Sequence, residues 1–65
     1  MKILDTIKEM SKNYKVQIRL IVEPDGTINI YVGNEKINYL TTNENTTEDF
    51  VCFCLRECVE MYFRR

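Results

Sequence analysis

The chain has 65 residues, of which 45% are hydrophobic and 29% are charged, and its formal net charge is −1. This length predicts a single domain over residues 1–65 with a thin core, because so short a chain buries only about 60% of its unfolded surface. The composition excludes a disordered chain, and the absence of a basic excess leads us to expect no direct binding of nucleic acid.

The sequence contains no apolar run that approaches the roughly 18–20 residues of a membrane span, so we expect no membrane association. Asp5 and Glu9 interrupt the N-terminal segment where a signal peptide would be continuously apolar. We therefore expect a cytoplasmic protein in a reducing compartment, without structural disulfides.

Residues 2–13 are predicted to form an amphipathic helix. Ile3, Ile7, Met10 and Tyr14 recur at intervals of three and four residues, while charged side chains occupy the other side. Asn13 is a plausible end of this helix.

Residues 15–23 change to a period of two, which is typical of a half-buried strand. The sequence Pro24-Asp25-Gly26 then predicts a tight turn, because proline presets φ and glycine accepts a positive φ. Alternation resumes in residues 27–33, so the two strands are expected to form a hairpin. The side chains expected to face inward are Val16, Ile18, Leu20, Val22, Ile28, Ile30 and Val32.

A second turn at residues 33–35 leads into a short third strand over residues 36–40, with Ile37 and Tyr39 expected to face inward. Ile21, Tyr31 and Leu40 would then form a small apolar patch on the outer face. A polar loop over residues 41–47 precedes a final helix, which is expected to begin near Asn45 or Thr46 and to run to about Arg64. The predicted fold class is α+β in the order α-β-β-β-α: a three-stranded antiparallel meander sheet with two helices packed on one face.

The three cysteines of the chain, Cys52, Cys54 and Cys58, all lie in the final helix. Cys54 and Cys58 share a face, whereas Cys52 points nearly opposite to Cys54, so one metal ion cannot easily reach all three. The leading interpretation is buried or half-buried thiols, and the alternatives are an intermolecular disulfide through Cys52 and a metal or redox site. We expect no metal and no cofactor.

The apolar arc of the final helix is wider than packing on a sheet requires. Cys52, Val59 and Phe63 extend it to one side. Either the first helix covers this flank, or the flank is a homodimer or partner interface.

No active-site motif is present. The chain lacks histidine, a nucleophile elbow and a glycine-rich phosphate loop, so an enzyme is not expected. The α-β-β-β-α order is also that of double-stranded-RNA-binding domains, but the start of the final helix is acidic at Glu48 and Asp49, where such domains need basic residues.

Several segments together resemble one family. These are the opening MKILDTIKEM, Asn13-Tyr14 leading into a strand, TINIYVGNE, and NYLTTNENTTEDF entering a helix. They resemble the small acidic anti-CRISPR proteins, which are phage inhibitors of type II CRISPR nucleases. The resemblance implies a compact body of a helix, a three-stranded antiparallel sheet and helical C-terminal structure, located in the cytoplasm of the host cell.

The resemblance also implies a mechanism and a set of contact residues. The family's acidic surface acts as a DNA mimic and occupies the nuclease's site for the short DNA motif beside the target. Arginine side chains of the nuclease bind the DNA motif at this site. The corresponding residues here would be Asp25, Asn34, Glu35, Glu44, Glu48 and Asp49, with Tyr14 as a flanking contact. The alternative function is a small homodimeric interaction or regulatory module that associates through the final helix.

Overall fold

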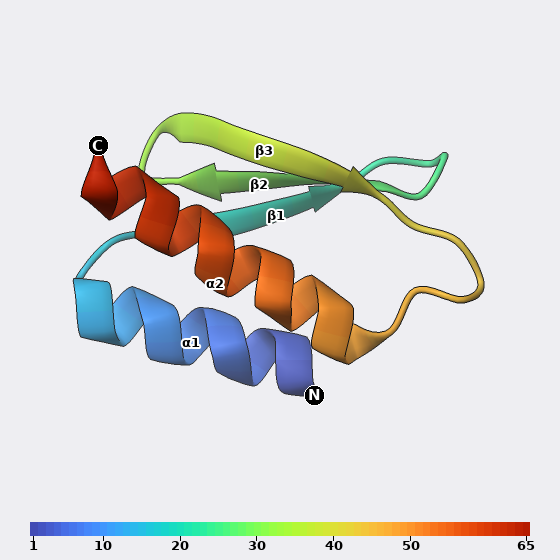
Figure 1. The fold of residues 1–65 in the computed structure, drawn as a ribbon, viewed down its shortest axis with the longest axis horizontal. Helices are drawn as coiled ribbons and strands as arrows, with labels where there is room; N and C mark the ends of the chain where they lie inside the picture. The colour runs from blue at the N-terminus through green and yellow to red at the C-terminus, as the bar shows by residue number, and fades with distance from the viewer.

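The fold was obtained as a computed structural model that describes residues 1–65. It confirms an α+β fold in the order α-β-β-β-α (Figure 1). The elements are α1 (Lys2–Tyr14), β1 (Ile18–Val22), β2 (Thr27–Val32), β3 (Glu35–Thr41) and α2 (Glu48–Arg64).

The sheet is an antiparallel meander with the strand order β1-β2-β3. Leu20 lies opposite Ile30 in the first hairpin, and Ile28 lies opposite Leu40 in the second. Both helices pack on the same face of the sheet, with α1 against β1 and α2 against β2 and β3 (Figure 1). The main core lies between α2 and the sheet and contains Ile28, Ile30, Leu40, Val51, Leu55 and Cys58.

The two helices run side by side in the same direction, with both N-termini at one end of the molecule (Figure 1). Their contacts advance in step along both helices: the Lys2 ammonium pairs with Asp49, Thr6 Oγ1 donates to Cys52 Sγ, and the Tyr14 ring stacks on Phe63. Met10 packs with Val59 between the last two of these contacts. The positions on α1 are four residues apart, so one stripe of that helix makes the whole set of contacts.

This stripe covers the flank of α2 that was a candidate dimer or partner face. Cys52 is 8% exposed, Val59 is fully buried, and only Phe63 remains 46% exposed beneath Tyr14. Of the two interpretations of the wide apolar arc, the structure therefore matches the one in which the first helix provides the cover.

One prediction about the third strand was wrong. Tyr39 is 59% exposed and faces away from the helices, whereas Leu40 is buried in the core. The cause is a β-bulge: Ile30 lies opposite Asn38 and Tyr31 lies opposite Lys36, so Ile37 is an extra residue. An extra residue reverses the alternation beyond it, and Ile37 and Leu40 consequently both pack against the core.

The helix ends also differ from those predicted. Lys15, with φ of 53°, ends α1 in the left-handed conformation, and its strand begins only at Ile18. Thr47 is the N-cap of α2, and its Oγ1 accepts a hydrogen bond from the Phe50 N–H. The helix therefore begins at Glu48, later than the predicted Asn45 or Thr46, and its third position is Phe50 rather than the acid of a capping box.

Val22 was expected inside but is 66% exposed. It lies on the helix-facing side of β1, opposite Ile28, at the last position of the strand.

Neither helix of the structure is long and apolar enough to span a lipid bilayer.

Candidate partner-binding site

The turn between β1 and β2 presents an acid in a fixed conformation. The Gly26 N–H donates to the Glu23 carbonyl, and Asp25 Oδ1 accepts the Thr27 N–H at 2.9 Å. Gly26 has φ of 91°, which a residue with a Cβ rarely adopts. The hydrogen bond from Thr27 lowers the pKa of the Asp25 carboxyl below its ordinary value of 3.8, because the bond favours the charged form.

The loop between β3 and α2 is closed by its own hydrogen bonds. The Asn43 N–H donates a hydrogen bond to Thr46 Oγ1 at 2.9 Å, and the Thr46 N–H donates one to the Asn43 carbonyl at 3.0 Å. Asn43 Oδ1 also accepts the Asn45 N–H. Glu44 lies at the exposed tip of this loop, so a locally ordered backbone presents its carboxylate to solvent.

Thr42 joins the loop to the hairpin. Its Oγ1 donates to the Gly26 carbonyl at 2.5 Å, and its backbone N–H donates to the same oxygen at 3.3 Å. These bonds bring Asp25 and Glu44 to the same end of the molecule although they are far apart in the sequence.

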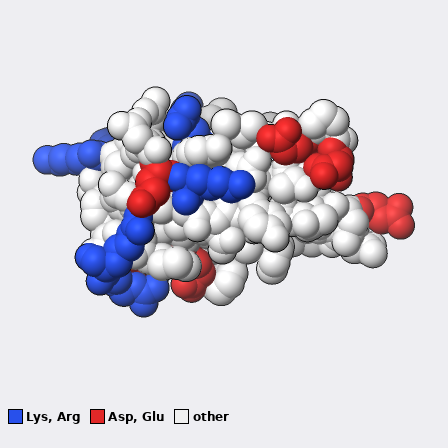
Figure 2. All heavy atoms as spheres, turned by 90° about the horizontal axis from the view of Figure 1, so that it is seen from above, with Lys and Arg blue, Asp and Glu red and all other residues white.

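We call Glu23, Asp25 and Glu44 the acidic end; all three are exposed. Figure 2 shows acidic side chains at this end of the molecule and a concentration of Lys and Arg at the other. The molecule is 32 Å along its longest axis, so the two ends are well separated. The carboxylates of Glu23 and Asp25 each make one internal hydrogen bond, whereas none was found for Glu44. Most of their acceptor capacity therefore faces solvent.

Glu48 and Asp49 both have partners on α1. Asp49 Oδ1 lies 2.5 Å from Lys2 Nζ, and Glu48 Oε1 accepts the Ile3 N–H at 3.4 Å. The Asp49 hydrogen bond and charge raise the pKa of Lys2 above its ordinary value. Both acids lie in the first turn of α2, where negative charge also favours the helix.

The remaining predicted contact residues lie at the opposite end. Asn34 and Glu35 follow β2 at the turn into β3, and Glu35 forms an ion pair with Arg65. Tyr14 stacks on Phe63, with ring centroids 4.9 Å apart. The structure therefore does not assemble the seven predicted residues into one surface: Asp25 and Glu44 are together, Glu48 and Asp49 lie at the helix starts, and three residues are remote.

Sequence reasoning did not include Glu23 in the candidate set. Its Oε1 accepts a hydrogen bond from Asn29 Nδ2 at 3.1 Å, which orients it beside the hairpin turn. The signal that could have found it is its position immediately before Pro24, since the residues flanking a tight turn are close in space.

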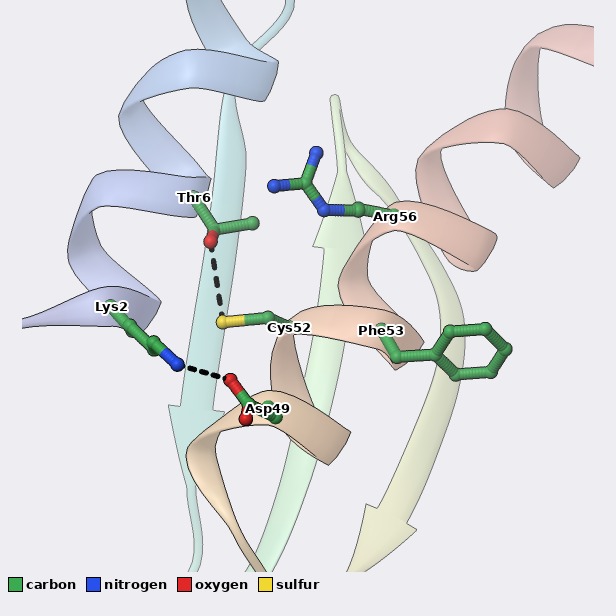
Figure 3. A pocket seen from close by; sticks show the side chains of 6 residues that line it. All are labelled: Lys2, Thr6, Asp49, Cys52, Phe53 and Arg56. Atoms are coloured by element: carbon green, nitrogen blue, oxygen red, sulfur yellow. Dashed lines mark hydrogen bonds and ion pairs between the residues drawn. The ribbon is translucent and has the colours of Figure 1, made fainter.

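A shallow hollow of about 330 Å³ opens between the N-terminal halves of α1 and α2 (Figure 3). Thr6 and Cys52 lie at its centre, joined by a hydrogen bond of 3.2 Å, and the Lys2–Asp49 pair closes one side. The Arg56 side chain reaches across toward α1, where Nη1 lies 3.8 Å from Met10 Sδ. The polar groups of the hollow are thus mostly engaged with one another, and we assign it a role in joining the helices.

The three cysteines are all free thiols. Burial raises the pKa of the Cys58 thiol, and it also raises the pKa of the Cys54 thiol, which is partly exposed. A raised pKa keeps a thiol protonated near neutral pH and lowers its reactivity. This is the behaviour of packing residues.

Comparison with known proteins finds no relative. No protein-family model matches the chain, and neither the curated proteins nor the solved structures include a significant match.

Proposed function

We propose that this chain is an anti-CRISPR protein that inhibits a type II CRISPR nuclease by binding its DNA-motif-reading surface through the acidic end. The observation that carries the proposal is the joining of the β1–β2 turn to the loop before α2 by the Thr42–Gly26 hydrogen bonds. This joining keeps Asp25 and Glu44 at the same end of the molecule, where both are exposed and their charges are available to a partner.

The chemistry of this end suits an arginine-rich protein surface. Carboxylates accept paired hydrogen bonds from guanidinium groups, and arginines that read DNA in a nuclease are held ready for such acceptors. The separation of acidic and basic ends would also orient the inhibitor as it approaches a positive groove, which accelerates association. The resemblance of MKILDTIKEM, TINIYVGNE and NYLTTNENTTEDF to this inhibitor family supports the same class of target.

A DNA cleavage assay tests the proposal. Purified type II nucleases of several orthologues, each loaded with guide RNA, are mixed with the protein either before or after target DNA. We expect inhibition when the protein is added first and little inhibition after the target is bound, because the DNA then occupies the motif-reading surface. Unchanged cleavage by every orthologue in both orders would overturn the proposal.

A small homodimeric interaction module is the second candidate function. The flank of α2 first considered for it is covered by α1, so a dimer through Cys52, Val59 and Phe63 would require the two helices to separate. Exposed apolar side chains elsewhere nevertheless favour self-association, among them Ile21 and Val22 on β1, which are 40% and 66% exposed. Light scattering of the purified protein over a range of concentrations tests this candidate: a dimer supports it, and a monomer at every concentration opposes it.

A further inference from the structure

The two outer strands of the sheet differ in how well they are protected against pairing with another strand. On β3, the bulge at Ile37 disrupts the ladder and the charged residues Glu35 and Lys36 lie next to it. Bulges and charges of this kind are the usual protection of an edge strand. On β1, the sequence Ile18-Arg19-Leu20-Ile21-Val22 is regular, apolar apart from Arg19 and rich in β-branched residues, with no bulge against β2.

The backbone of β1 has hydrogen-bonding groups available at its free edge. The Glu23 N–H donates to Thr27 of β2, and the Gln17 carbonyl accepts the Gly33 N–H, so these odd-numbered residues point their backbone groups toward β2. Alternate residues of a strand point their backbone groups to opposite sides. The N–H and C=O groups of Leu20 and Val22 therefore point outward, away from the sheet.

The side chains of β1 are self-complementary. When two copies of this strand are placed antiparallel with Ile21 opposite its own symmetry mate, Leu20 of one copy faces Val22 of the other. Leu20 and Val22 are also the residues with outward backbone groups, so they would form the hydrogen-bonded pairs. In the same register, Arg19 of each copy faces Glu23 of the other on the same side of the sheet, giving two opposite-charge pairs.

We propose that β1 is a homodimer interface, in which two copies pair antiparallel about a twofold axis at Ile21. The occupant of this edge is a second copy of the chain, because the arrangement of Arg19, Ile21 and Glu23 complements itself and no other sequence is required. The pairing would cover Ile21 and Val22, which are among the exposed apolar residues of the monomer. Since the other edge is protected at β3, assembly would stop at the dimer.

The flank of α1 that faces away from α2 is consistent with this assembly. Thr6 faces Cys52 of α2, and Leu4 precedes it by two residues, which places Leu4 about 200° around the helix. Leu4 is 48% exposed. It therefore points away from α2 and is available to further contacts near the N-terminus of the helix.

Exchanging the charges of Arg19 and Glu23 tests the register in which the two β1 strands pair. Arg19→Glu and Glu23→Arg are prepared singly and together, and the dimer dissociation constant is measured by analytical ultracentrifugation. Each single variant should weaken the dimer at least about tenfold, because like charges then face each other across the strands. The double variant restores opposite charges and should recover the dimer. Arg19→Glu loses the contact with Tyr31, Glu23→Arg loses the hydrogen bond from Asn29, and the double variant loses both. If these losses damaged the fold, the double variant would dimerise least, so recovery of its dimer excludes that explanation.

Disulfide trapping tests whether the twofold axis of the dimer passes at Ile21. Ile21→Cys should form a covalent dimer with mild oxidant, since residues facing each other in a non-hydrogen-bonded pair lie close enough to bridge. Lys36→Cys on β3 is the matched control and should form no covalent dimer under the same oxidant, and neither should the unsubstituted chain. A protein that stays monomeric at millimolar concentration would overturn the proposal, and so would a dimer that is insensitive to the charge exchange. Glu23 belongs to both proposed surfaces, so nuclease inhibition is tested separately by the cleavage assay and by Glu44→Lys, which the dimer contact does not include.

Discussion

Thr42 and Gly26 are joined by two hydrogen bonds, from the Thr42 hydroxyl at 2.5 Å and from its backbone N–H at 3.3 Å, both to the Gly26 carbonyl. This contact links the β1–β2 turn to the loop before α2. It is the reason that Asp25 and Glu44 share one end of the molecule, and the proposed function depends on it.

Thr42→Val should loosen this link. The variant keeps the shape of the side chain but loses the hydroxyl donor, so we expect a loss of about 1 kcal/mol in the free energy of unfolding, the usual contribution of one hydrogen bond. Urea denaturation followed by circular dichroism measures it. Thr41→Val is the control and should leave stability nearly unchanged, because Thr41 is an exposed strand residue without a side-chain hydrogen bond here. Equal stability of the two variants would show that the hydroxyl bond is not made in solution.

Val59→Ala should destabilise the packing between the helices. Val59 is fully buried in a cluster with Met10 and Val32, and truncation removes two methyl groups at about 0.8 kcal/mol each and leaves a cavity. We expect a loss of about 2–3 kcal/mol in the free energy of unfolding, which is a large fraction of the stability of a domain this small. Denaturant unfolding checks this, with the exposed Glu60→Ala as control. A loss no larger than that of the control would mean that α1 does not cover this flank.

The thiols should react in an order set by their exposure. Cys54 is partly exposed, whereas Cys52 and Cys58 are buried, so Cys54 should be alkylated first and the other two mainly after unfolding. Because burial raises the pKa of Cys54, its rate should be slower than that of a free thiol at neutral pH and should rise as the pH increases above the ordinary thiol range. Mass spectrometry of iodoacetamide-treated protein, native and denatured, measures both effects. Preferential labelling of Cys58 in the native protein would contradict the packing of α2.

Asp25 should make stability depend on pH in the acid range. Its folded pKa is depressed, so the charged form contributes stability that is present above the unfolded value of about 3.8 and is lost as the pH falls through the folded pKa. Asp25→Asn keeps an acceptor for the Thr27 N–H but removes the charge. The difference in unfolding free energy between the two proteins should therefore favour the natural chain near neutral pH and diminish below pH 3.8. A difference that does not change with pH would assign the turn's stability to the uncharged hydrogen bond alone.

Local patterns predicted most of the fold because each element carries its own signal. The spacing of Ile3, Ile7 and Met10 marks α1, and Pro24-Asp25-Gly26 marks the hairpin turn. The bulge at Ile37 carries no comparable signal, and a single inserted residue exchanged the positions of Tyr39 and Leu40. Side-chain periodicity thus predicts a strand but cannot locate an insertion within it.

The candidate site was predicted only in part, for a different reason. The sequence shows which residues are acidic, but it does not show which of them already have partners. Asp49 is paired with Lys2 and Glu35 with Arg65, both across contacts between distant segments. The hydrogen bond between Thr42 and Gly26 also joins segments that are distant in the sequence. The location of Asp25 and Glu44 at one end could therefore be known only from the fold.

The most direct test of the central claim compares charge reversals at the two ends of the molecule. Binding of the guide-loaded nuclease is measured by biolayer interferometry for Glu44→Lys, Glu35→Lys and the helix-surface control Glu60→Lys. If the acidic end is the binding surface, Glu44→Lys should weaken binding at least about a hundredfold, because it places a cation against arginines, whereas the other two should bind nearly as the natural chain does. Full binding by Glu44→Lys together with loss of binding by Glu35→Lys would contradict the account and place the interface at the opposite end.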